Sequence, residues 1–574
     1  MTDSEAFEPS RAVGAIEAYE VPRPETPVDV HLDGNEGQPP PETFLESVEE
    51  LSREEIRSYP GRDPVMEAIS DRHDIPKERL IVTAGADEAI MRTCRVALEP
   101  GRKMVLPQPT FSMMPRFSSL VGAEVDTLEW TSGDYPADDV IERIDEKTGL
   151  VVVVSPNNPT GLTASDDDIR RLAEAAKGAI VLVDHAYVEF ADEDLTHLAV
   201  EYDNVVVTRT LSKAWGMAGL RVGYAVAAPK IVDWLDAAGN PYPVSGPSVR
   251  ISSRRVATAE EDVEDYIERV RGERTMLGNK LRGYGADVTE SEGNFVFGHF
   301  DEAAWLHDAL AGMGIAVRAF PDEGGLSDAL RITCPGDTEL FGRLNEAFET
   351  IFEPQALFLD LDGVLADVSG SYRQAIRKTA AHYGLTLSDH DVSEAKSEGE
   401  ANNDWILTQR LLSEAGIEVE FEEVKSTYEA FYQGEGERRG LWRNETLMYE
   451  IERLEELAAK IPLGIVTGRP QRDADRFFEH TGLGDVVEAT VCMEDAPQKP
   501  EPDPVELLAE RMGVERAWLF GDTPDDARAA RAAGFLPLGT IAPGEDEGTM
   551  RPALIEAGCA RVLDDLDELE ELLP

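Results

Sequence analysis

Two short stretches of the chain hold residues whose types and spacing could do chemistry. The first reads TRTLSKAWGMAGLRVGY, in which Lys213 lies between small hydroxyl residues and a glycine-rich segment and Arg221 follows eight positions later. A buried lysine flanked by a cation can be neutral and nucleophilic enough to form a Schiff base. The second reads FLDLDGVLAD, in which Asp360 and Asp362 end an apolar run. If the strand geometry persists, both carboxylates emerge on one face, which suits nucleophilic and acid–base chemistry.

Further residues could complete a cofactor pocket around the lysine. The segment VTAGADEAI places Ala86 and Asp87 at a strand-to-helix turn, where free backbone N–H groups and the helix dipole can hold a phosphate. Asn158 follows a strand in SPNNPTG, and Asp184 and Tyr187 follow another in VLVDHAYVEF. A carboxylate at that strand end could keep a pyridinium nitrogen protonated, which makes the ring an electron sink.

Further residues also accompany the aspartate pair. Thr467 ends a strand in IVTGR, and Lys499 lies between prolines in APQKPEPDP. Asp522 and Asp526 follow a third strand in LFGDTPDDARAARAAG. An isolated D-x-D-G also describes calcium loops and ordinary turns, but the later residues favour a catalytic site. Because clustered carboxylates repel one another, the group indicates a bound cation.

The elements that must position these residues follow an α/β pattern. Short β-branched runs such as RLIVTAG, LVVVVSPNNP and VVVTRTLSK alternate with helix-length segments, which is typical of a mostly parallel sheet. Long charged helices begin near residue 235, and Pro354 lies between a helix and the strand LFLDLDGVL. We therefore expect a large domain over 41–234, a small domain over 1–40 and 235–353, and a separate domain over 354–574. Residues 373–455 are continuously helix-like and predict a helical cap inserted after the first strand of that last domain.

Composition excludes several kinds of partner. The formal net charge of the 574 residues is -59, so the surface would repel nucleic acid and anionic membranes. Twelve lysines stand beside 42 arginines, and this acidic, lysine-poor pattern resembles proteins of salt-loving organisms. A specific basic partner is the alternative explanation.

The four cysteines are scattered without a C-x-x-C pair, and the chain has no apolar N-terminal segment or run of 18 or more apolar residues. These features favour a reduced cytoplasmic location and argue against a zinc site.

The first group of motifs, over roughly residues 10–350, resembles the fold-type I pyridoxal-phosphate aminotransferases, most closely the histidinol-phosphate aminotransferase branch. The resemblance implies that Lys213 bonds to the cofactor and later moves the substrate Cα proton. It implies that Asp184 pairs with the pyridine nitrogen, that Asn158 and Tyr187 contact the ring oxygen, and that Phe111 stacks on the ring. The residues implied to hold the cofactor phosphate are Ala86, Asp87, Thr210, Ser212 and Arg221.

The same resemblance implies substrate-binding and subunit contacts. Arg331 in LRITCPGD matches the arginine that fixes the anionic group of the substrate, and Arg318 in GIAVRAF could help with a phosphate. Tyr59 of YPG matches the tyrosine that reaches the cofactor phosphate of the neighbouring subunit, which implies a homodimer; a local turn tyrosine is the alternative.

The chain departs from the family pattern at three places. Gly37 follows Asn35 and Glu36 where the family usually reads N-E-N-P, Phe111 replaces the more common tyrosine, and His185 replaces a glutamate. On a strand, His185 would face away from Asp184, so we interpret it as a structural histidine.

The second group of motifs, from residue 356 to about 570, resembles the haloacid dehalogenase-like phosphatases. The resemblance implies that Asp360 attacks phosphorus, and that Asp362 protonates the leaving oxygen and then activates water. Thr467 and Lys499 would neutralise the phosphoryl group. The implied magnesium ligands are Asp360, the backbone of Asp362, Asp522 and Asp526. The acid at position 362 favours ester hydrolysis over dehalogenation, and SEGEANNDW (397–405) could line the pocket or form an exposed loop.

We therefore expect a bifunctional enzyme in which a glutamate-dependent histidinol-phosphate transaminase is fused to a magnesium-dependent phosphatase, for which histidinol-phosphatase is the candidate activity. One alternative is an aromatic amino acid aminotransferase or a threonine-phosphate decarboxylase-like enzyme, fused to a phosphoglycolate-type phosphatase. Another is that the C-terminal domain senses a phosphorylated ligand without turnover.

Overall fold

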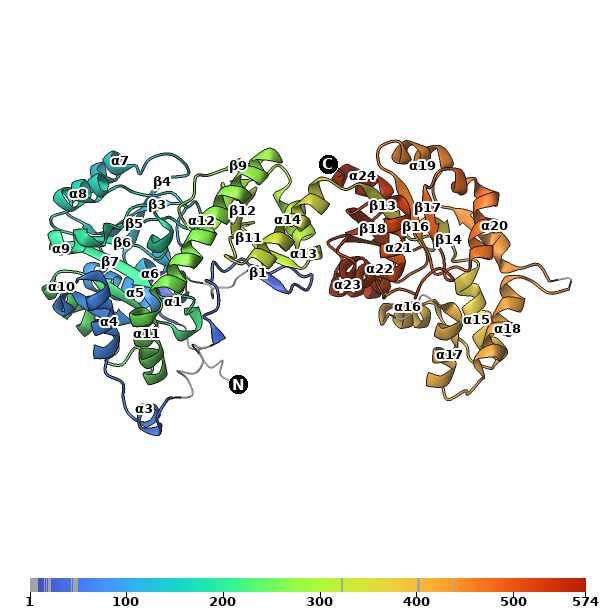
Figure 1. Ribbon diagram of the computed structural model, residues 1–574, viewed down its shortest axis with the longest axis horizontal. Helices are drawn as coiled ribbons and strands as arrows, with labels where there is room; N and C mark the ends of the chain where they lie inside the picture. Colours follow the sequence, from blue (N-terminus) through green and yellow to red (C-terminus); the bar gives the residue numbers. More distant parts are fainter. Residues whose placement is uncertain are drawn as a thin grey trace, which may run out of the picture. The chain divides into compact units, whose positions relative to one another are not determined.

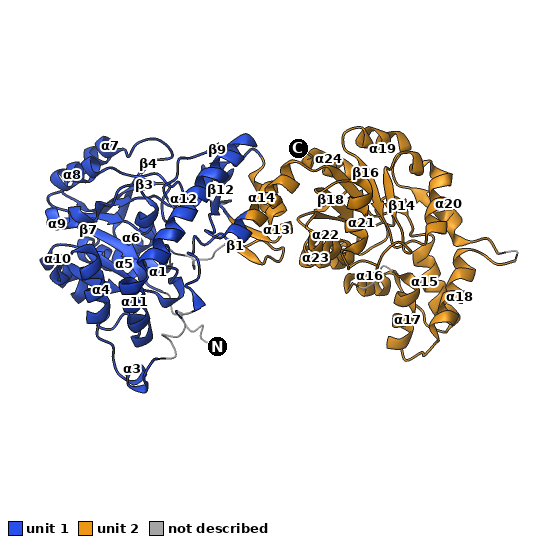
Figure 2. Ribbon diagram, in the orientation of Figure 1, with its two compact units in different colours: residues 1–22, 32–301, 318–341 blue, residues 23–31, 302–317, 342–574 orange. Residues whose placement is uncertain are grey.

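The computed structural model describes residues 9–14, 16, 18, 22–42, 44, 50–321, 324–399, 403–436 and 438–574 (Figure 1). The chain divides into two compact units, which Figure 2 draws in different colours. Unit 1 comprises residues 1–22, 32–301 and 318–341, and unit 2 comprises residues 23–31, 302–317 and 342–574. Across the described ranges, no helix combines the length and the apolar character needed to cross a membrane.

A seven-stranded sheet forms the centre of unit 1. Its strands are β2 (Leu80–Thr83), β3 (Lys103–Gln108), β4 (Glu124–Glu129), β5 (Thr148–Val154), β6 (Ile180–Asp184), β7 (Val205–Thr210) and β8 (Gly223–Val226). They lie in the order β2-β8-β7-β6-β5-β3-β4, and only β8 runs antiparallel to its neighbours. Strands β2, β5, β6 and β7 therefore run in one direction, and their carboxyl ends share one edge. In α/β sheets this edge is where ligands bind.

Helices surround this sheet, and β5 and β6 are buried at every position, as expected for a parallel sheet covered on both faces. The α-helices are α1 (Arg11–Gly14), α3 (Arg53–Arg57), α4 (Asp63–His73), α5 (Gly85–Ala97), α6 (Met113–Leu120), α7 (Ala137–Glu142), α8 (Asp166–Ala175), α9 (Leu198–Glu201), α10 (Pro229–Ala237), α11 (Gly246–Thr258) and α12 (Glu260–Gly283). Short 3-10 turns are η1 (Lys77–Arg79), η2 (Val188–Phe190), η3 (Leu195–His197) and η4 (Ala218–Leu220). Helix α5 begins almost directly after β2, so its N-terminus lies at the ligand-binding edge.

A second sheet has the order β1-β11-β12-β10-β9. Its strands are β1 (Val30–Leu32), β9 (Asp287–Val288), β10 (Phe295–His299), β11 (Ile315–Ala319) and β12 (Ala329–Thr333), and the boundary between the units falls within β1 and β11. In unit 1, β11 pairs antiparallel with β12 so that Arg318 lies directly opposite Arg331. Helices α13 (Ala303–Gly312) and α14 (Thr338–Phe352) flank these strands in the sequence.

A six-stranded parallel sheet in the order β17-β16-β13-β18-β19-β20 forms the centre of unit 2. The strands are β13 (Ala356–Leu359), β16 (Leu463–Val466), β17 (Ala489–Val491), β18 (Ala517–Gly521), β19 (Leu536–Thr540) and β20 (Val562–Leu563). The remaining elements are α19 (Ile451–Ala458), α20 (Gln471–Thr481), η6 (Leu483–Asp485), α21 (Asp503–Met512), α22 (Pro524–Ala532), α23 (Glu547–Ala557) and α24 (Leu566–Leu572). This Rossmann-like sheet confirms the fold class expected for the C-terminal part.

A helical cap is inserted between β13 and β16. It consists of α15 (Tyr372–His382), α16 (Asp389–Ser397), α17 (Asp404–Glu414), α18 (Phe421–Tyr432) and the turn η5 (Leu441–Asn444), and a small ribbon of β14 (Ala366–Asp367) and β15 (Thr446–Leu447) leads into and out of it. The cap has an apolar core of its own, in which Ile376, Leu407, Val424 and Tyr428 are buried. Burial of these apolar side chains within the cap stabilises its helices against one another.

Unit 2 includes residues from both sides of position 353 because several contacts join them. The ring centroids of Trp305 and Trp518 lie 5.4 Å apart. The Thr26 hydroxyl donates to the carbonyl oxygen of Cys559 at 2.8 Å, and Arg531 is 3.1 Å from Asp29. Elements of the first motif region are thus packed on the C-terminal sheet.

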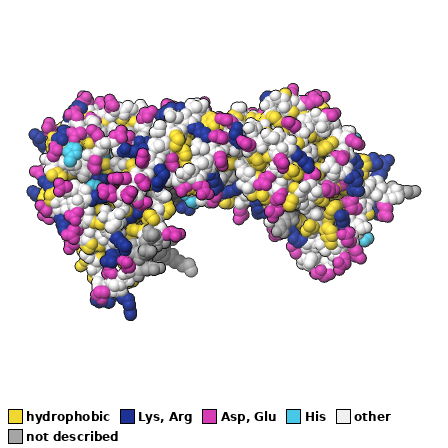
Figure 3. Space-filling model, in the orientation of Figure 1, with side chains coloured by type: hydrophobic (Ala, Val, Ile, Leu, Met, Phe, Trp, Pro, Cys, Tyr) yellow, Lys and Arg dark blue, Asp and Glu magenta, His cyan; other side chains and the backbone are white. Residues whose placement is uncertain are grey.

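The distribution of acidic side chains and the state of the cysteines agree with what the composition indicates. On the face drawn in Figure 3, aspartate and glutamate side chains are spread over the surfaces of both units. All four cysteines are free and buried.

Candidate active sites

A cavity of about 280 Å³ lies in unit 1 at the carboxyl edge of the seven-stranded sheet. It brings together all but one of the residues predicted for the first site. The predicted residues that line it are Ala86, Asp87, Phe111, Asn158, Asp184, Tyr187, Thr210, Ser212, Lys213, Arg221, Arg318 and Arg331. They come from segments up to 245 positions apart in the sequence.

Lys213 and Asp184 form the chemical centre of this cavity. The Lys213 amino group donates to the carbonyl oxygen of Gly34 at 3.0 Å and lies 5.5 Å from the ring centroid of Tyr187. Asp184 ends β6, and the Thr208 hydroxyl of β7 donates to it at 3.1 Å. Burial raises the pKa of Asp184 to about 7, because an ionised carboxylate is poorly solvated there. A cationic partner would therefore be needed to keep Asp184 ionised.

An anion cradle lies beside the lysine. It combines the first residues of α5 with the hydroxyl groups of Thr210 and Ser212, which hydrogen-bond to each other at 2.9 Å. Arg221 forms a 3.0 Å ion pair with Asp87. Gly85 has a positive φ of 76°, which favours glycine, and a Cβ atom added there would lie 2.9 Å from the Arg221 guanidinium and displace it. Such a cluster of donors at a helix N-terminus suits a phosphate group.

Tyr187 is held in place by a residue that the sequence-based site prediction did not include. The side-chain amide of Asn35 donates to the Tyr187 hydroxyl at 3.1 Å, and Thr333 donates to Asn35 at 2.9 Å. Asn35 is buried and has a positive φ of 52°. Asparagine tolerates this conformation better than most residues, which is a signal that the LDGNEG stretch already carried.

Two arginines meet at the wall of the cavity formed by the small sheet. Arg318 and Arg331 are opposite residues on β11 and β12 and both line the cavity. Arg331 donates to the side-chain oxygen of Asn158 at 2.5 Å and also to the backbone oxygen of Asp33. Like charges placed directly opposite on neighbouring strands are unfavourable, so this arrangement suits a bound anion.

Tyr59 does not line the cavity. It is 82% exposed and stacks on Tyr242 with ring centroids 4.7 Å apart. His185 is buried, one ring nitrogen lies against the carbonyl of Ser155, and the other accepts from the backbone N–H of Leu195 at 3.0 Å. Burial lowers the pKa of His185 to about 4, which is consistent with a neutral, structural histidine.

The donor set of this cavity fits pyridoxal phosphate. The buried carboxylate of Asp184 matches a protonated ring nitrogen, the cradle at α5 matches the phosphate, and Phe111 and Tyr187 offer aromatic and hydroxyl contacts. Lys213 offers a primary amine, the group with which an aldehyde cofactor could form a Schiff base.

A second site lies at the carboxyl edge of the sheet in unit 2. Asp360 follows β13, Asp522 follows β18, and Asp526 lies in the first turn of α22. All three are buried, and their ligand oxygens lie within 4.8 Å of one another. The buried Lys499 donates to Asp360 at 2.7 Å and also to Asp526.

The electrostatics of this cluster call for a cation. Burial raises the pKa values of Asp360 and Asp522, and the neighbouring carboxylates add to the effect in both. Lys499 offsets this for Asp360. A divalent cation with oxygen ligands would let all three aspartates ionise, so the cluster fits Mg²⁺.

Asp362 is positioned by an arginine that sequence reasoning did not single out. Arg469 is 1% exposed and donates through Nε to Asp362 at 2.7 Å. It also donates to the buried Glu445 at 2.9 Å and lies 5.1 Å from the ring centroid of Tyr372. Its position two residues after Thr467, in IVTGR, was the available signal.

Thr467 follows β16, and its hydroxyl accepts from the backbone N–H of Arg469 at 3.1 Å. It lines a small neighbouring cavity together with Lys499. The main pocket of unit 2, about 70 Å³, is lined on the sheet side by Asp360, Asp362 and Asp522.

The cap closes the other side of this pocket. Asn403, Asp404 and Trp405 of the stretch 397–405 line the pocket, whereas positions 400–402 of that stretch lie outside the described residues.

Comparison with known proteins gives matches for both parts. A model of the aminotransferase class I and II family matches residues 31–348, and a model of the haloacid dehalogenase-like hydrolases matches residues 354–534. Histidinol-phosphate aminotransferase 1 of Trichormus variabilis is 33% identical over 317 residues, which cover 54% of this chain and 89% of that protein. The two family matches make pyridoxal phosphate and Mg²⁺ the cofactors of the chain.

Two further proteins are similar to parts of this chain. An imidazoleglycerol-phosphate dehydratase of Phytophthora nicotianae is 43% identical over 197 residues, which cover 33% of this chain, and the chain spans only 44% of that protein. The solved structure of histidinol-phosphate aminotransferase from Sinorhizobium meliloti in complex with pyridoxal-5′-phosphate has a TM-score of 0.54 at 19% identity. The match covers 60% of this chain and 99% of the Sinorhizobium meliloti chain, which shows a shared fold.

Proposed function

We propose a two-step function for this chain, which belongs to the class I and II aminotransferases over residues 31–348 and carries a haloacid dehalogenase-like hydrolase domain over residues 354–534. The first step is the reversible transfer of an amino group from glutamate to imidazole-acetol phosphate, which yields histidinol phosphate and 2-oxoglutarate. The second is Mg²⁺-dependent hydrolysis of the phosphate monoester, with histidinol phosphate as the substrate. Both reactions belong to histidine biosynthesis.

The observation that carries the substrate assignment is the pair Arg318 and Arg331. Both line the lysine cavity from opposite positions on neighbouring strands. Glutamate presents a carboxylate and imidazole-acetol phosphate a phosphate, and two guanidinium forks can bind either anion in turn. The names of several relatives, including the one from Trichormus variabilis, support the phosphate-bearing substrate.

The chain's own residues would divide the work of transamination. Bound pyridoxal phosphate supplies an electron sink for the bond broken at the substrate Cα. Lys213 would accept the proton from the substrate Cα and would deliver it to the C4′ carbon of the bound cofactor. Asp184 holds the proton on the ring nitrogen, and the donors at α5 with Arg221 bind the cofactor phosphate.

The second site would hydrolyse the monoester in two displacements. An oxygen of Asp360 attacks phosphorus while the ester bond breaks, and Asp362 gives its proton to the leaving alcohol oxygen. Asp362 then takes a proton from water, which attacks the phosphoryl group and releases Asp360 and inorganic phosphate. Thr467 would donate a hydrogen bond to the transferring phosphoryl group, and Lys499 together with a bound Mg²⁺ would offset its negative charge. We assign the metal to Asp360, Asp522, Asp526 and the backbone oxygen of Asp362.

Two further assignments belong to the proposal. Tyr59 is exposed and stacked on Tyr242, which fits a tyrosine offered to the cofactor phosphate of a second subunit in a homodimer. We assign the aminotransferase to residues 1–353 and the phosphatase to residues 354–574, with the helical cap over 373–455, and we place the enzyme in the cytoplasm. The similarity to an imidazoleglycerol-phosphate dehydratase supports substrates that carry an imidazole ring and a phosphate.

A substrate panel tests the first activity. We expect turnover of histidinol phosphate with 2-oxoglutarate to exceed that of phenylalanine and tyrosine by at least about 100-fold in kcat/KM, because these two amino acids carry no phosphate for the two arginines. Strong turnover of aromatic amino acids with none of histidinol phosphate would overturn the assignment. For the second activity, a failure to release phosphate from any monoester with Mg²⁺ at low and at molar salt would indicate a non-catalytic phosphate sensor.

A further inference from the structure

The pocket under the cap is unusually acidic for a site that binds a phosphate ester. Its lining includes six acidic side chains and two basic ones, Lys396 and Arg469. Three of the acids lie on the sheet side, where Arg469 pairs with Asp362, Lys499 pairs with Asp360, and a bound Mg²⁺ would offset the remaining charge. On the cap side, Glu429 pairs with Arg472 at 3.1 Å. Near the cap, Asp473 of α20 pairs with Arg476 at 2.9 Å. Five of the six acidic side chains that line the pocket thus lie near a cation or in the proposed metal site. The sixth is Asp404.

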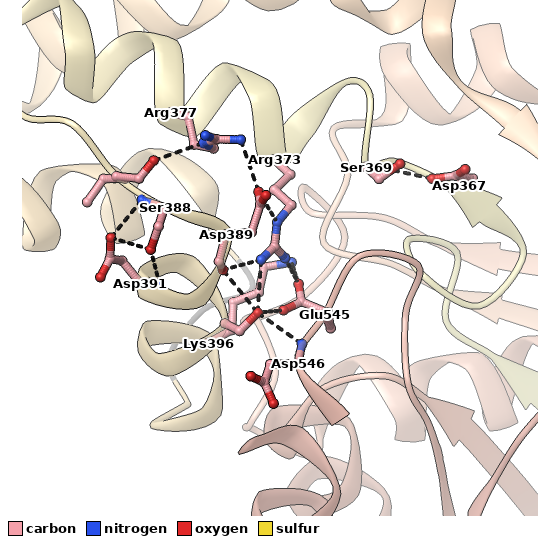
Figure 4. A network of polar contacts seen from close by, with 12 residues as sticks. Asp367, Ser369, Arg373, Arg377, Ser388, Asp389, Asp391, Lys396, Glu545 and Asp546 are labelled. Carbon is pink, nitrogen blue, oxygen red and sulfur yellow. Dashed lines mark hydrogen bonds and ion pairs between the residues drawn. The ribbon is translucent and has the colours of Figure 1, made fainter. Parts of the chain in front are cut away.

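Lys396 forms no ion pair with Asp404 within the described residues, because its ion-pair partner is Glu545. Figure 4 shows this lysine of α16 directed toward Glu545, in the segment between β19 and α23. The two side chains are 3.6 Å apart, and the Glu545 side chain is 3% exposed. Arg373 of α15 also pairs with Glu545 and lies 3.3 Å from Asp389. Arg377 also pairs with Asp389, at 3.0 Å, so three cations meet two carboxylates in this network, and the carboxylate within ion-pair distance of Lys396 is Glu545. Burial would raise the pKa of Glu545, but Lys396 and Arg373 outweigh burial and hold it below its usual value.

Asp404 is the acid that remains. It begins α17 and lines the pocket, and the Tyr428 hydroxyl donates to it at 2.8 Å. In the part of the chain that the structure describes, Asp404 forms no ion pair, and Lys396 and Arg469 act on it only at longer range. Burial raises its pKa, so a full charge at this place is unfavourable until a cation arrives. The neighbouring rings of Tyr372 and Tyr428 also line the pocket, and aromatic faces accept cations well.

We propose that Asp404 is a specificity residue that binds a cationic group on the leaving alcohol, so that the phosphatase site selects phosphate monoesters of amino alcohols. The inference rests on the proposed phosphatase function and narrows its substrate class. The phosphate end of such an ester meets Asp360 and Lys499, while its ammonium group meets Asp404 from the cap. An ester of a neutral or anionic alcohol would leave Asp404 unmatched, which weakens its binding.

The test compares kcat/KM for phosphoethanolamine, glycerol 1-phosphate, phosphoglycolate and histidinol phosphate with saturating Mg²⁺ at fixed salt. The variants are Asp404→Asn, which keeps the acceptor for Tyr428, and Asp404→Glu, which keeps the charge. Glu422→Gln is the matched control, because Glu422 is an exposed acid of α18 in the same cap and does not line the pocket.

We expect the wild type to favour the two cationic esters. Asp404→Asn should lower the ratio of kcat/KM for phosphoethanolamine over glycerol 1-phosphate by about 10- to 100-fold, mainly through KM, as for loss of a charge-assisted contact. Asp404→Glu should restore part of the ratio, and Glu422→Gln should retain it.

Two results would overturn the inference while the phosphatase function stands: a wild type that hydrolyses all esters without regard to charge, or an unchanged ratio in Asp404→Asn. Preference for phosphoethanolamine without turnover of histidinol phosphate would support the inference and reject histidinol phosphate as the substrate. No hydrolysis of any ester would overturn both.

Discussion

Replacing Arg469 by methionine should damage the phosphatase in a defined way. Arg469 is fully enclosed and bonds to both Asp362 and the buried Glu445. Methionine fills much of the same volume but leaves two carboxylates without their cation, one of them buried. Breaking a buried pair by removing one partner typically costs about 3–5 kcal/mol. Because Asp362 is then no longer held, we also expect kcat to fall by about 100-fold or more, the scale of general acid catalysis.

Chemical unfolding followed by tryptophan fluorescence, together with phosphate release from histidinol phosphate, measures both effects. Arg551→Met is the matched control: Arg551 forms an exposed pair with Glu547, which is worth about 1 kcal/mol at most. Aminotransferase activity is an internal control for the rest of the chain. Adding Glu445→Gln to Arg469→Met should recover part of the lost stability, since it removes the buried unpaired charge. A loss below about 1 kcal/mol, or no recovery in the double variant, would refute the reasoning.

Three further predictions concern the first site and the whole chain. Arg331→Gln should lower kcat/KM for histidinol phosphate by about 100-fold, because two charge-assisted contacts are lost, while the absorbance of the bound cofactor persists; steady-state kinetics and a visible spectrum check this. The pKa of His185 falls from 6.5 to about 4 on folding, so the unfolded chain takes up this proton first, and about 3 kcal/mol of stability should be lost as the pH drops from about 6.5 to 4. Unfolding titrations should show a shallower loss for His185→Asn, and equal slopes would contradict the assignment. From the net charge of -59, we expect the melting temperature to rise between low salt and molar KCl, and an unchanged melting temperature would speak against it.

Much of both sites could be predicted because the residues follow strands. Asp184, Asp360 and Asp522 each end an apolar run, and the carboxyl ends of parallel strands meet at one edge of a sheet. The local pattern therefore predicted that the residues of each site meet at the carboxyl edge of a sheet, although it contains no information on long-range contacts. The helical cap was predictable for a different reason: its apolar residues recur with a helical period, unlike those of the flanking strands.

The residues that the sequence did not reveal act through distant partners. Arg469 contacts Asp362 and Glu445, which lie 107 and 24 positions away, and the local signal for its role was its place two residues after Thr467 in IVTGR. The stretch 397–405 was a candidate pocket lining, but the sequence did not single out Asp404 within it, because its proposed role depends on the pairing of Lys396 with Glu545, 149 positions later in the chain.

The packing of the early elements on the C-terminal sheet was equally hidden. It depends on non-local contacts such as Trp305 with Trp518, which no periodicity encodes. Tyr59 remains a prediction, because its proposed role lies in a second subunit.

One measurement tests the central claim that two active sites in one chain carry out successive reactions. The protein is incubated with imidazole-acetol phosphate, glutamate and Mg²⁺, and histidinol phosphate, histidinol and free phosphate are followed separately. We expect the wild type to form histidinol and phosphate in equal amounts, Asp360→Asn to accumulate histidinol phosphate, and Lys213→Ala to form none of the three while it still hydrolyses added histidinol phosphate. Histidinol formation by Asp360→Asn at the wild-type rate, or accumulation of histidinol phosphate by the wild type without phosphate release, would contradict the account.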